Sequence, residues 1–191
     1  MPSPPARVVG AALLALLLSA GAISIAASTG KQTGLRPLLR PGEKAPAFTL
    51  SDIDGKRVTY RPAGRKPSLV VFWSAFCPLC RELTPFLNDI ARRHGGSVRI
   101  VSVNLDGKRF SHAVQAFARD SGIAYPVLYD DLRGDFFIAS DPYGIEKTPT
   151  AVLVDAGGTV RAAYVAEGIR EMIRNFETAV SGLKKGTGVK K

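Results

Sequence analysis

The chain has 191 residues and a formal net charge of +10, a balance that on its own would suggest nucleic-acid binding. The charge is unevenly spread, because residues 42–183 hold 18 Lys and Arg against 16 Asp and Glu and the excess lies near the two ends. Basic ends next to an apolar segment favour loose attraction to anionic lipid. We therefore expect no nucleic-acid partner. Residues 42–183 are long enough for one domain with a full core, but not for two.

Residues 8–27 form a charge-free run rich in Ala, Leu and Ile. As a helix, this run would be about 30 Å long, the thickness of the hydrocarbon core of a bilayer. Residues 1–28 are therefore interpreted as either a cleaved signal peptide, with the small residues 26–28 at its cleavage site, or an uncleaved membrane anchor. The length of the run slightly favours the anchor. Both interpretations predict a domain in the periplasm or at the outer face of the cytoplasmic membrane.

A basic linker is expected over residues 29–41, and a flexible basic tail over residues 184–191. Within the domain, residues 48–59 indicate two short strands around an Asp54-Gly55 turn. Residues 68–73 are continuously apolar, as expected for a strand that is buried on both faces.

The remaining elements alternate between helices and strands. They are predicted as a helix over 77–93, a strand over 98–103, a helix over 112–120, a short extended piece over 127–129, a short helix over 134–140, two strands over 150–154 and 160–165 joined by a hairpin turn, and an amphipathic helix over 167–183. Parallel strands linked through a helix and followed by an antiparallel hairpin indicate an α/β fold. Its central mixed β-sheet is flanked by helices on both faces and carries an N-terminal β-hairpin extension.

The only two cysteines, Cys77 and Cys80, are three residues apart at the predicted start of a helix that follows a buried strand. Free backbone N–H groups and the helix dipole favour a thiolate there, and Pro78 fits the first helical position. We therefore predict that Cys77 has a lowered pKa and acts as the nucleophile. Cys80, one turn further along the helix, would be shielded and would resolve a mixed disulfide.

A metal site is the main alternative for this pair of thiols. Four-coordinate zinc would require both His94 and His112 to converge on the cysteines, although both lie elsewhere in the pattern of elements. Haem attachment would require a histidine directly after the second cysteine, where Arg81 stands. We therefore expect neither a metal nor another cofactor.

The segment from Trp73 to Arg81, Trp-Ser-Ala-Phe-Cys-Pro-Leu-Cys-Arg, resembles the thioredoxin superfamily. The upstream Ala-Pro-Ala-Phe-Thr-Leu over residues 45–50 and the later Tyr-Gly-Ile-Glu-Lys-Thr-Pro-Thr over residues 143–150 narrow the resemblance to the TlpA/ResA-like anchored thioredoxins. The resemblance covers residues 41–165 and implies a thioredoxin-like fold. It also implies that Pro149 is cis and faces the dithiol, in a substrate groove formed by Trp73, Pro78, Thr148 and Pro149.

The same resemblance implies a thiol–disulfide oxidoreductase that acts on disulfides or dithiols of partner proteins and receives electrons from a membrane donor. A reductase for cytochrome c maturation is the first expectation, and a maturation factor for another periplasmic enzyme, such as methylamine dehydrogenase, is the second. A non-enzymatic metal-binding protein with this fold is a further alternative.

The sequence departs from the family at two positions beside the dithiol. Many relatives have Glu where Leu83 stands, and thioredoxin has a buried Asp where Val71 stands. Either acid would accept the proton of the buried thiol. Glu82 is a neighbouring candidate, although helical geometry directs it away from the face that carries Leu83.

Overall fold

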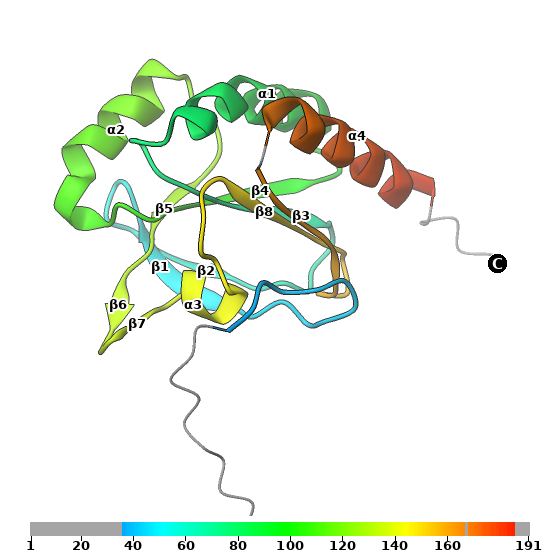
Figure 1. The fold of residues 1–191 in the computed structure, drawn as a ribbon, viewed down its shortest axis with the longest axis horizontal. Helices are drawn as coiled ribbons and strands as arrows, with labels where there is room; N and C mark the ends of the chain where they lie inside the picture. Colours follow the sequence, from blue (N-terminus) through cyan, green and yellow to red (C-terminus); the bar gives the residue numbers. More distant parts are fainter. Residues whose placement is uncertain (1–35, 167, 186–191) are drawn as a thin grey trace, which may run out of the picture. The chain divides into compact units, whose positions relative to one another are not determined.

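The computed structural model describes residues 36–166 and 168–185 and contains a seven-stranded sheet with the order β2-β1-β5-β4-β3-β8-β9 (Figure 1). The strands of this sheet are β1 (Phe48–Asp52), β2 (Arg57–Tyr60), β3 (Ser68–Trp73), β4 (Arg99–Asn104), β5 (Val127–Tyr129), β8 (Thr150–Val154) and β9 (Val160–Val165). The helices are α1 (Pro78–His94), α2 (Ser111–Asp120), α3 (Ser140–Tyr143) and α4 (Ile169–Lys185), and a 3-10 turn, η1 (Lys108–Phe110), precedes α2.

The strand directions confirm the mixed sheet. Strands β3, β4 and β5 run parallel to one another, whereas β8 pairs antiparallel with β3 and β9 antiparallel with β8. The N-terminal hairpin of β1 and β2 extends the sheet because β1 pairs antiparallel with β5. Residues 127–129, expected only as an extended piece, are thus an internal strand.

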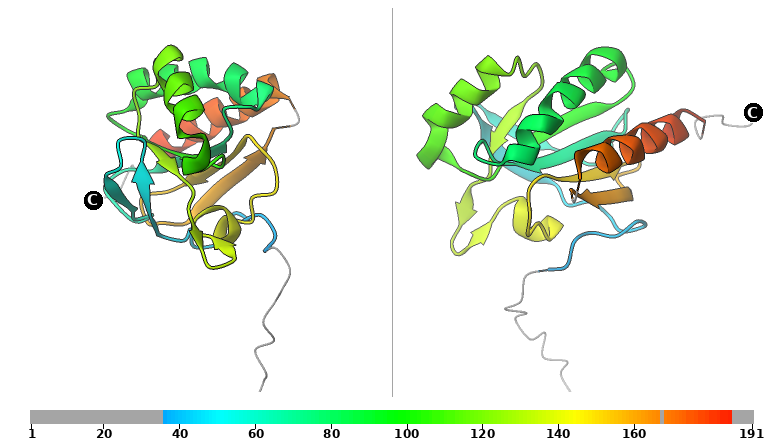
Figure 2. Two further views of the ribbon diagram at one scale, coloured as in Figure 1. Left: turned by 90° about the vertical axis from the view of Figure 1, so that its left-hand side faces the viewer. Right: turned by 45° about the horizontal axis from the view of Figure 1, so that its top comes forward.

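Strand β3 lies at the centre of the core, and all six of its residues are buried. Its side chains alternate between the two faces, so Leu69 and Val71 pack on one side and Val70 and Phe72 on the other. The side with Leu69 and Val71 is covered by α1 and α4, which lie next to each other above the sheet (Figure 2). This packing fixes the start of α1 at the end of β3.

The opposite face has less helical cover than the sequence predicts. Its only described helix is α3, four residues long, whose Tyr143 is completely buried against Phe48 and Phe72. Leu39 also packs there, and its backbone N–H donates to the Tyr143 carbonyl oxygen at 3.2 Å. The linker predicted for residues 29–41 is therefore too long at its C-terminal end, because an apolar side chain near that end belongs to the core.

The short helix predicted over residues 134–140 is wrong for most of its length. Residues Leu132–Arg133 (β6) and Phe136–Phe137 (β7) form a small separate hairpin around Gly134, whose φ of +64° is a conformation that glycine adopts readily. Helix α3 starts only at Ser140. There the buried carboxylate of Asp130 accepts the N–H groups of Ala139 and Ser140 at 3.0 and 2.9 Å. Contacts with this distant carboxylate, rather than local periodicity, set the boundary.

Helix α4 runs through Lys185, so the predicted tail loses its first two residues to the helix. The apolar run over residues 8–27 lies outside the described residues. Among residues 36–166 and 168–185, no helix has both the length and the apolar character required to cross a membrane.

Candidate active site

The two cysteines lie at the junction of β3 and α1, as predicted. Cys77 is the N-cap of α1, with an extended backbone conformation, and Pro78 follows in the first turn. Both cysteines are free thiols; Cys77 is half-buried, whereas Cys80 is only 2% exposed. The apolar side chains of α1 pack on the sheet, and this packing holds the dithiol at the carboxyl end of β3.

The sulfur of Cys77 contacts backbone groups on two sides. The backbone N–H of Cys80 donates to Cys77 Sγ at 3.3 Å, and Cys77 Sγ lies 3.5 Å from the carbonyl oxygen of Thr148, to which it donates. A backbone N–H directed at a sulfur stabilises negative charge on it. The geometry therefore favours Cys77 as the attacking sulfur.

The residues expected to form the substrate groove lie in different surroundings. The Thr148–Pro149 peptide bond is cis, as the resemblance implies; Thr148 is half-buried beside Cys77, and Pro149 is buried. Pro78 is exposed at the start of α1.

Trp73 does not fit the groove. It is only 5% exposed, packs on Phe117, and donates its indole N–H to Ser102 Oγ at 2.6 Å. Its position in β3 directs it to the same face as Val71, beneath the helices, so Trp73 is a core residue under the dithiol.

The surroundings of Cys80 are apolar. Val71 and Leu83, the two positions where the family resemblance implies an acid, are 0% and 1% exposed, and Glu82 is exposed on the outer side of α1. Burial raises the pKa of the Cys80 thiol to about 12; the neighbouring Cys77 adds to the rise, whereas hydrogen bonds with the Ser74 backbone and the Thr148 side chain act against it. Cys80 is thus a protonated thiol at neutral pH.

Asp106, which the sequence reasoning did not single out, binds the turn that leads to Cys77. Its carboxylate accepts the Ser74 hydroxyl at 2.6 Å and the Ala75 backbone N–H at 2.7 Å. Strands β3 and β4 are parallel, and Trp73 is opposite Asn104 in their register, so the residues that follow both strands meet at one edge. An acid just beyond β4 could have been noticed from this pattern.

The sequence analysis also did not predict that two aromatic side chains pack together next to the dithiol. Phe76 and Phe110 are 58% and 42% exposed, and their rings lie 5.3 Å apart in an edge-to-face arrangement. The guanidinium of Arg109 lies 5.6 Å from the Phe110 ring. Exposed aromatic rings that pack against each other beside a reactive sulfur offer an apolar surface to a binding partner.

The two histidines occupy separate helices, His94 at the end of α1 and His112 in the first turn of α2. Within residues 36–166 and 168–185, no group of three or more His, Cys, Asp and Glu side chains is arranged to hold a metal ion.

Comparison with known proteins gives consistent matches over most of the chain. A family model described as Redoxin matches residues 40–180. Thiol-disulfide oxidoreductase ResA of Bacillus thuringiensis (strain Al Hakam) is 26% identical over 165 residues, which cover 86% of this chain and 91% of the relative. Methylamine utilization protein MauD of Methylobacillus flagellatus is 31% identical over 148 residues, which cover 74% of this chain and 65% of the relative.

Among solved structures, a Chlorobium tepidum protein described as thiol:disulfide interchange protein DsbE matches with a TM-score of 0.62 and 26% identity, covering 74% of this chain and 98% of that chain. The chain therefore belongs to the Redoxin family, as a TlpA/ResA-like thiol–disulfide oxidoreductase with a thioredoxin fold.

Proposed function

We propose that this chain reduces disulfide bonds of partner proteins outside the cytoplasm, with Cys77 and Cys80 as its reactive pair. The observation that carries the proposal is the contrast between the sulfurs: Cys77 is half-buried and accepts a backbone N–H, whereas Cys80 is enclosed one turn behind it. An accessible nucleophile with a shielded second thiol is the arrangement that two-step disulfide exchange requires.

The reaction has two exchange steps. The Cys77 thiolate attacks one sulfur of the partner disulfide, forming a Cys77–partner disulfide and releasing the other partner sulfur as a thiolate, which takes up a proton. Cys80 then loses its proton and attacks Cys77 Sγ, which forms the Cys77–Cys80 disulfide and releases the second partner thiol. The partner gains two electrons and two protons, and a membrane electron donor returns the dithiol to its reduced form.

The groups around Cys77 suit an extended partner segment. The carbonyl oxygen of Thr148 lies next to the sulfur, and the cis-Pro149 follows it. On the aromatic side, Phe76 and Phe110 expose apolar surface. A partner segment that crosses Cys77 would contact Thr148, Pro149 and this aromatic pair.

Export of the domain is supported by the apolar run over residues 8–27, which serves as a signal peptide or as a membrane anchor. When it is fused after Gly34, a reporter enzyme that works only outside the cytoplasm is expected to be active. Activity of a cytoplasmic reporter such as β-galactosidase at this junction would contradict the proposed location.

Apocytochrome c is the first proposed substrate, as the resemblance to the TlpA/ResA-like anchored thioredoxins implies. Maturation of another periplasmic enzyme, such as methylamine dehydrogenase, is the second candidate, because the chain is 31% identical to a methylamine utilization protein. The Cys80→Ser variant would hold its partner as a mixed disulfide, so identification of the trapped protein distinguishes the two.

Reduction of insulin, measured together with the metal content of the purified protein, tests the activity itself. Catalysed reduction by a metal-free protein is expected. A protein that binds a metal ion through Cys77 and Cys80 and does not reduce insulin would instead be a metal carrier with this fold.

A further inference from the structure

The carboxylate of Asp106 is the centre of a hydrogen-bonded group at the edge where β3 and β4 end. Asp106 Oδ1 accepts the Ser74 hydroxyl at 2.6 Å, while Oδ2 accepts the Ala75 backbone N–H at 2.7 Å and the Asn104 side-chain amide at 2.8 Å. The Asp106 N–H in turn donates to Asn104 Oδ1 at 3.0 Å. Asp106 is half-buried, so these contacts are partly shielded from water.

The turn that this carboxylate holds leads directly into the dithiol. Ser74 Oγ accepts the Phe76 N–H at 3.1 Å, and the Ser74 carbonyl oxygen accepts the Cys77 N–H at 3.2 Å. The Ala75 N–H donates to Asp106, so every backbone N–H from residue 75 to residue 77 has a hydrogen-bond partner. The Ser74 backbone also hydrogen-bonds to the Cys80 thiol, so the turn contacts the backbone of Cys77 and the side chain of Cys80.

We infer that Asp106 is a positioning residue for the dithiol, which acts through Ser74 and Ala75 to hold Cys77 against the Cys80 N–H at the start of α1. This inference rests on the proposed function of Cys77 as the nucleophile. The fixed turn keeps the Cys77 sulfur within reach of the N–H that stabilises its thiolate. A loosened turn would separate the two groups and lower the reactivity of Cys77.

The negative charge of Asp106 would have the opposite effect if it acted through its field alone, because a carboxylate near a thiolate disfavours the thiolate. Substitution separates the two effects. In Asp106→Asn the charge is lost, but the amide oxygen still accepts from Ala75 and the amide N–H donates to Ser74 Oγ. In Asp106→Ala both the charge and the hydrogen bonds are lost.

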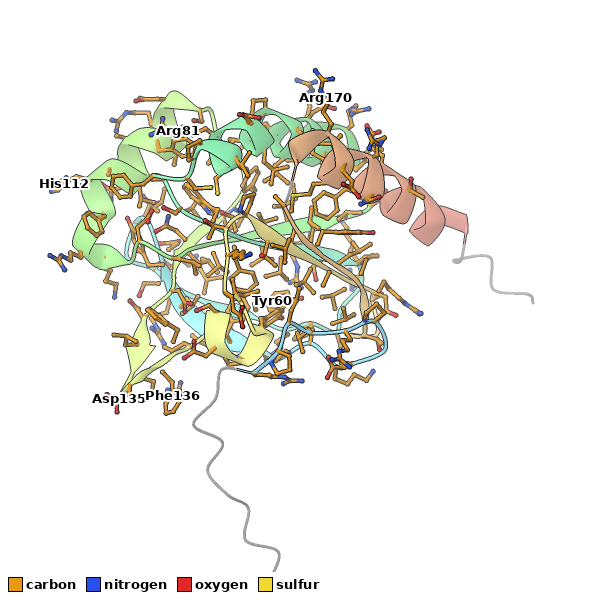
Figure 3. The ribbon with its side chains drawn as sticks, viewed as in Figure 1. Tyr60, Arg81, His112, Asp135, Phe136 and Arg170 are labelled. Carbon is orange, nitrogen blue, oxygen red and sulfur yellow. The ribbon has the colours of Figure 1, made fainter. Side chains whose placement is uncertain are left out.

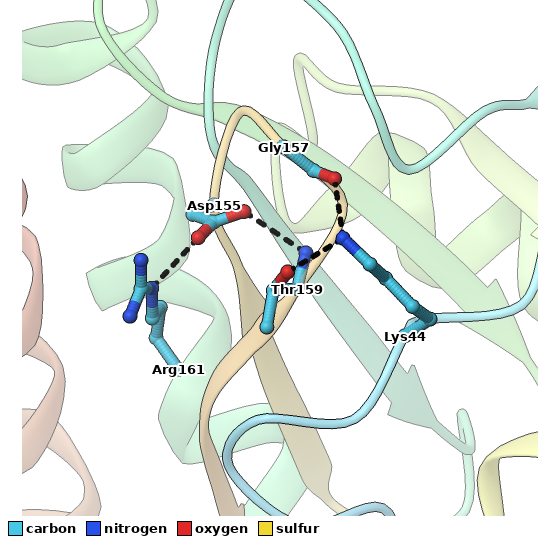
Figure 4. Close-up of polar contacts among 5 residues, drawn as sticks. All are labelled: Lys44, Asp155, Gly157, Thr159 and Arg161. Atoms are coloured by element: carbon cyan, nitrogen blue, oxygen red, sulfur yellow. Dashed lines mark hydrogen bonds and ion pairs between the residues drawn. The ribbon is translucent and has the colours of Figure 1, made fainter.

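Asp155 supplies a matched control at a turn remote from the dithiol. Its carboxylate accepts the Thr159 N–H at 2.9 Å and the Arg161 Nε–H at 2.7 Å, and so holds the turn between β8 and β9 (Figure 4). Asp155→Ala therefore removes a hydrogen-bonding carboxylate from a turn without touching residues 74–80.

The test is the rate at which iodoacetamide alkylates Cys77 in the reduced full-length variants between pH 5 and 9, with the site assigned by tandem mass spectrometry. Thermal unfolding of each variant is measured in parallel. Alkylation needs no partner protein. The inference about Asp106 can therefore fail while the protein still reduces insulin, and it can hold while insulin reduction fails. We expect Asp106→Ala to slow alkylation at pH 7 at least fivefold, Asp106→Asn to stay within twofold of the unmodified chain, and Asp155→Ala to leave the rate unchanged.

Three results would overturn the inference: equal acceleration in Asp106→Ala and Asp106→Asn, which indicates a field effect; an unchanged rate in Asp106→Ala; and equal slowing in Asp106→Ala and Asp155→Ala, which indicates general destabilisation. If Asp106→Ala does not fold, Ser74→Ala takes its place, because it removes the link between the hydroxyl and Asp106. It is expected to slow alkylation about twofold to threefold. An unchanged rate would contradict the inference that Asp106 positions Cys77 through its hydrogen bond with Ser74.

Discussion

Cys77 and Cys80 are one helical turn apart, yet their surroundings are opposite in kind. Cys77 lies at a polar turn where backbone groups approach its sulfur at 3.3 and 3.5 Å. Cys80 lies against an apolar layer that includes Trp73, Val114 and Phe117. The difference shows how one short motif produces two unlike thiols: one faces a backbone donor, a backbone acceptor and solvent, and the other is desolvated by the core.

Replacement of each sulfur is expected to have the largest effects. Cys77→Ser removes the attacking sulfur and should lower insulin reduction by at least about a thousandfold, because a serine hydroxyl is not a nucleophile at neutral pH. Cys80→Ser should still react once and then accumulate a stable mixed disulfide, visible by mass spectrometry. If Cys77→Ser accumulates the mixed disulfide instead, the two roles are reversed.

The raised pKa of Cys80 predicts a steep pH dependence for the second exchange step. At every pH well below about 12, the thiolate fraction of Cys80 grows with pH, and the resolution rate grows with it. Between pH 6 and pH 8 we expect an increase of about a hundredfold, which follows from about tenfold more thiolate per pH unit. Single-turnover release of a bound peptide thiol measures this rate. Fast resolution that does not vary with pH would show that another group takes the proton.

An acid placed beneath Cys80 should reduce the contrast between the two surroundings. Leu83→Glu supplies a proton acceptor beside Cys80, and we expect resolution at pH 7 to accelerate about tenfold, equivalent to about 1.4 kcal/mol of activation free energy. Because Leu83 is 1% exposed, the buried carboxylate should also lower the free energy of unfolding by about 1–3 kcal/mol.

Glu82→Gln is the control for Leu83→Glu, because Glu82 is exposed on the outer side of the same helix. It should leave the resolution rate unchanged. A slower Glu82→Gln variant would identify Glu82 as the proton acceptor and remove the basis for the steep pH dependence.

The smallest expected effect concerns the aromatic pair beside Cys77. Phe110→Ala should lower kcat/KM for a protein disulfide about threefold, or about 0.7 kcal/mol, and leave a small disulfide such as oxidised glutathione unaffected. Phe136→Ala is the matched control, since Phe136 is similarly exposed at 55%. It lies on the β6–β7 hairpin, on the opposite side of the sheet from Arg81, which follows Cys80 (Figure 3). Equal losses in the two variants would show that Phe110 has no special role in partner binding.

Local sequence patterns were sufficient to predict the central part of the fold and the place of the dithiol. A buried apolar strand, a Cys-Pro-Leu-Cys motif and an amphipathic helix follow one another without a gap, so the residues next to each other in the chain define the junction. The turn between β8 and β9 was equally predictable, because its Asp and Gly residues are adjacent in sequence.

These local patterns could not predict contacts between segments that are far apart in the sequence. Asp106 binds Ser74 across 32 residues, and the late start of α3 depends on the buried carboxylate of Asp130. The burial of Trp73 follows from the face to which β3 directs it, and Ser102 on the neighbouring strand accepts its indole N–H. Each of these features needs the register of the sheet, which composition and periodicity do not supply.

The difference between the two sulfurs is most directly tested by their alkylation rates in the reduced, unmodified chain. With limiting iodoacetamide at pH 7, we predict that Cys77 reacts at least about a hundredfold faster than Cys80, because only Cys77 is accessible and burial raises the pKa of the Cys80 thiol. Equal rates at the two positions, or a faster reaction at Cys80, would contradict the assignment of Cys77 as nucleophile and Cys80 as the buried resolving thiol.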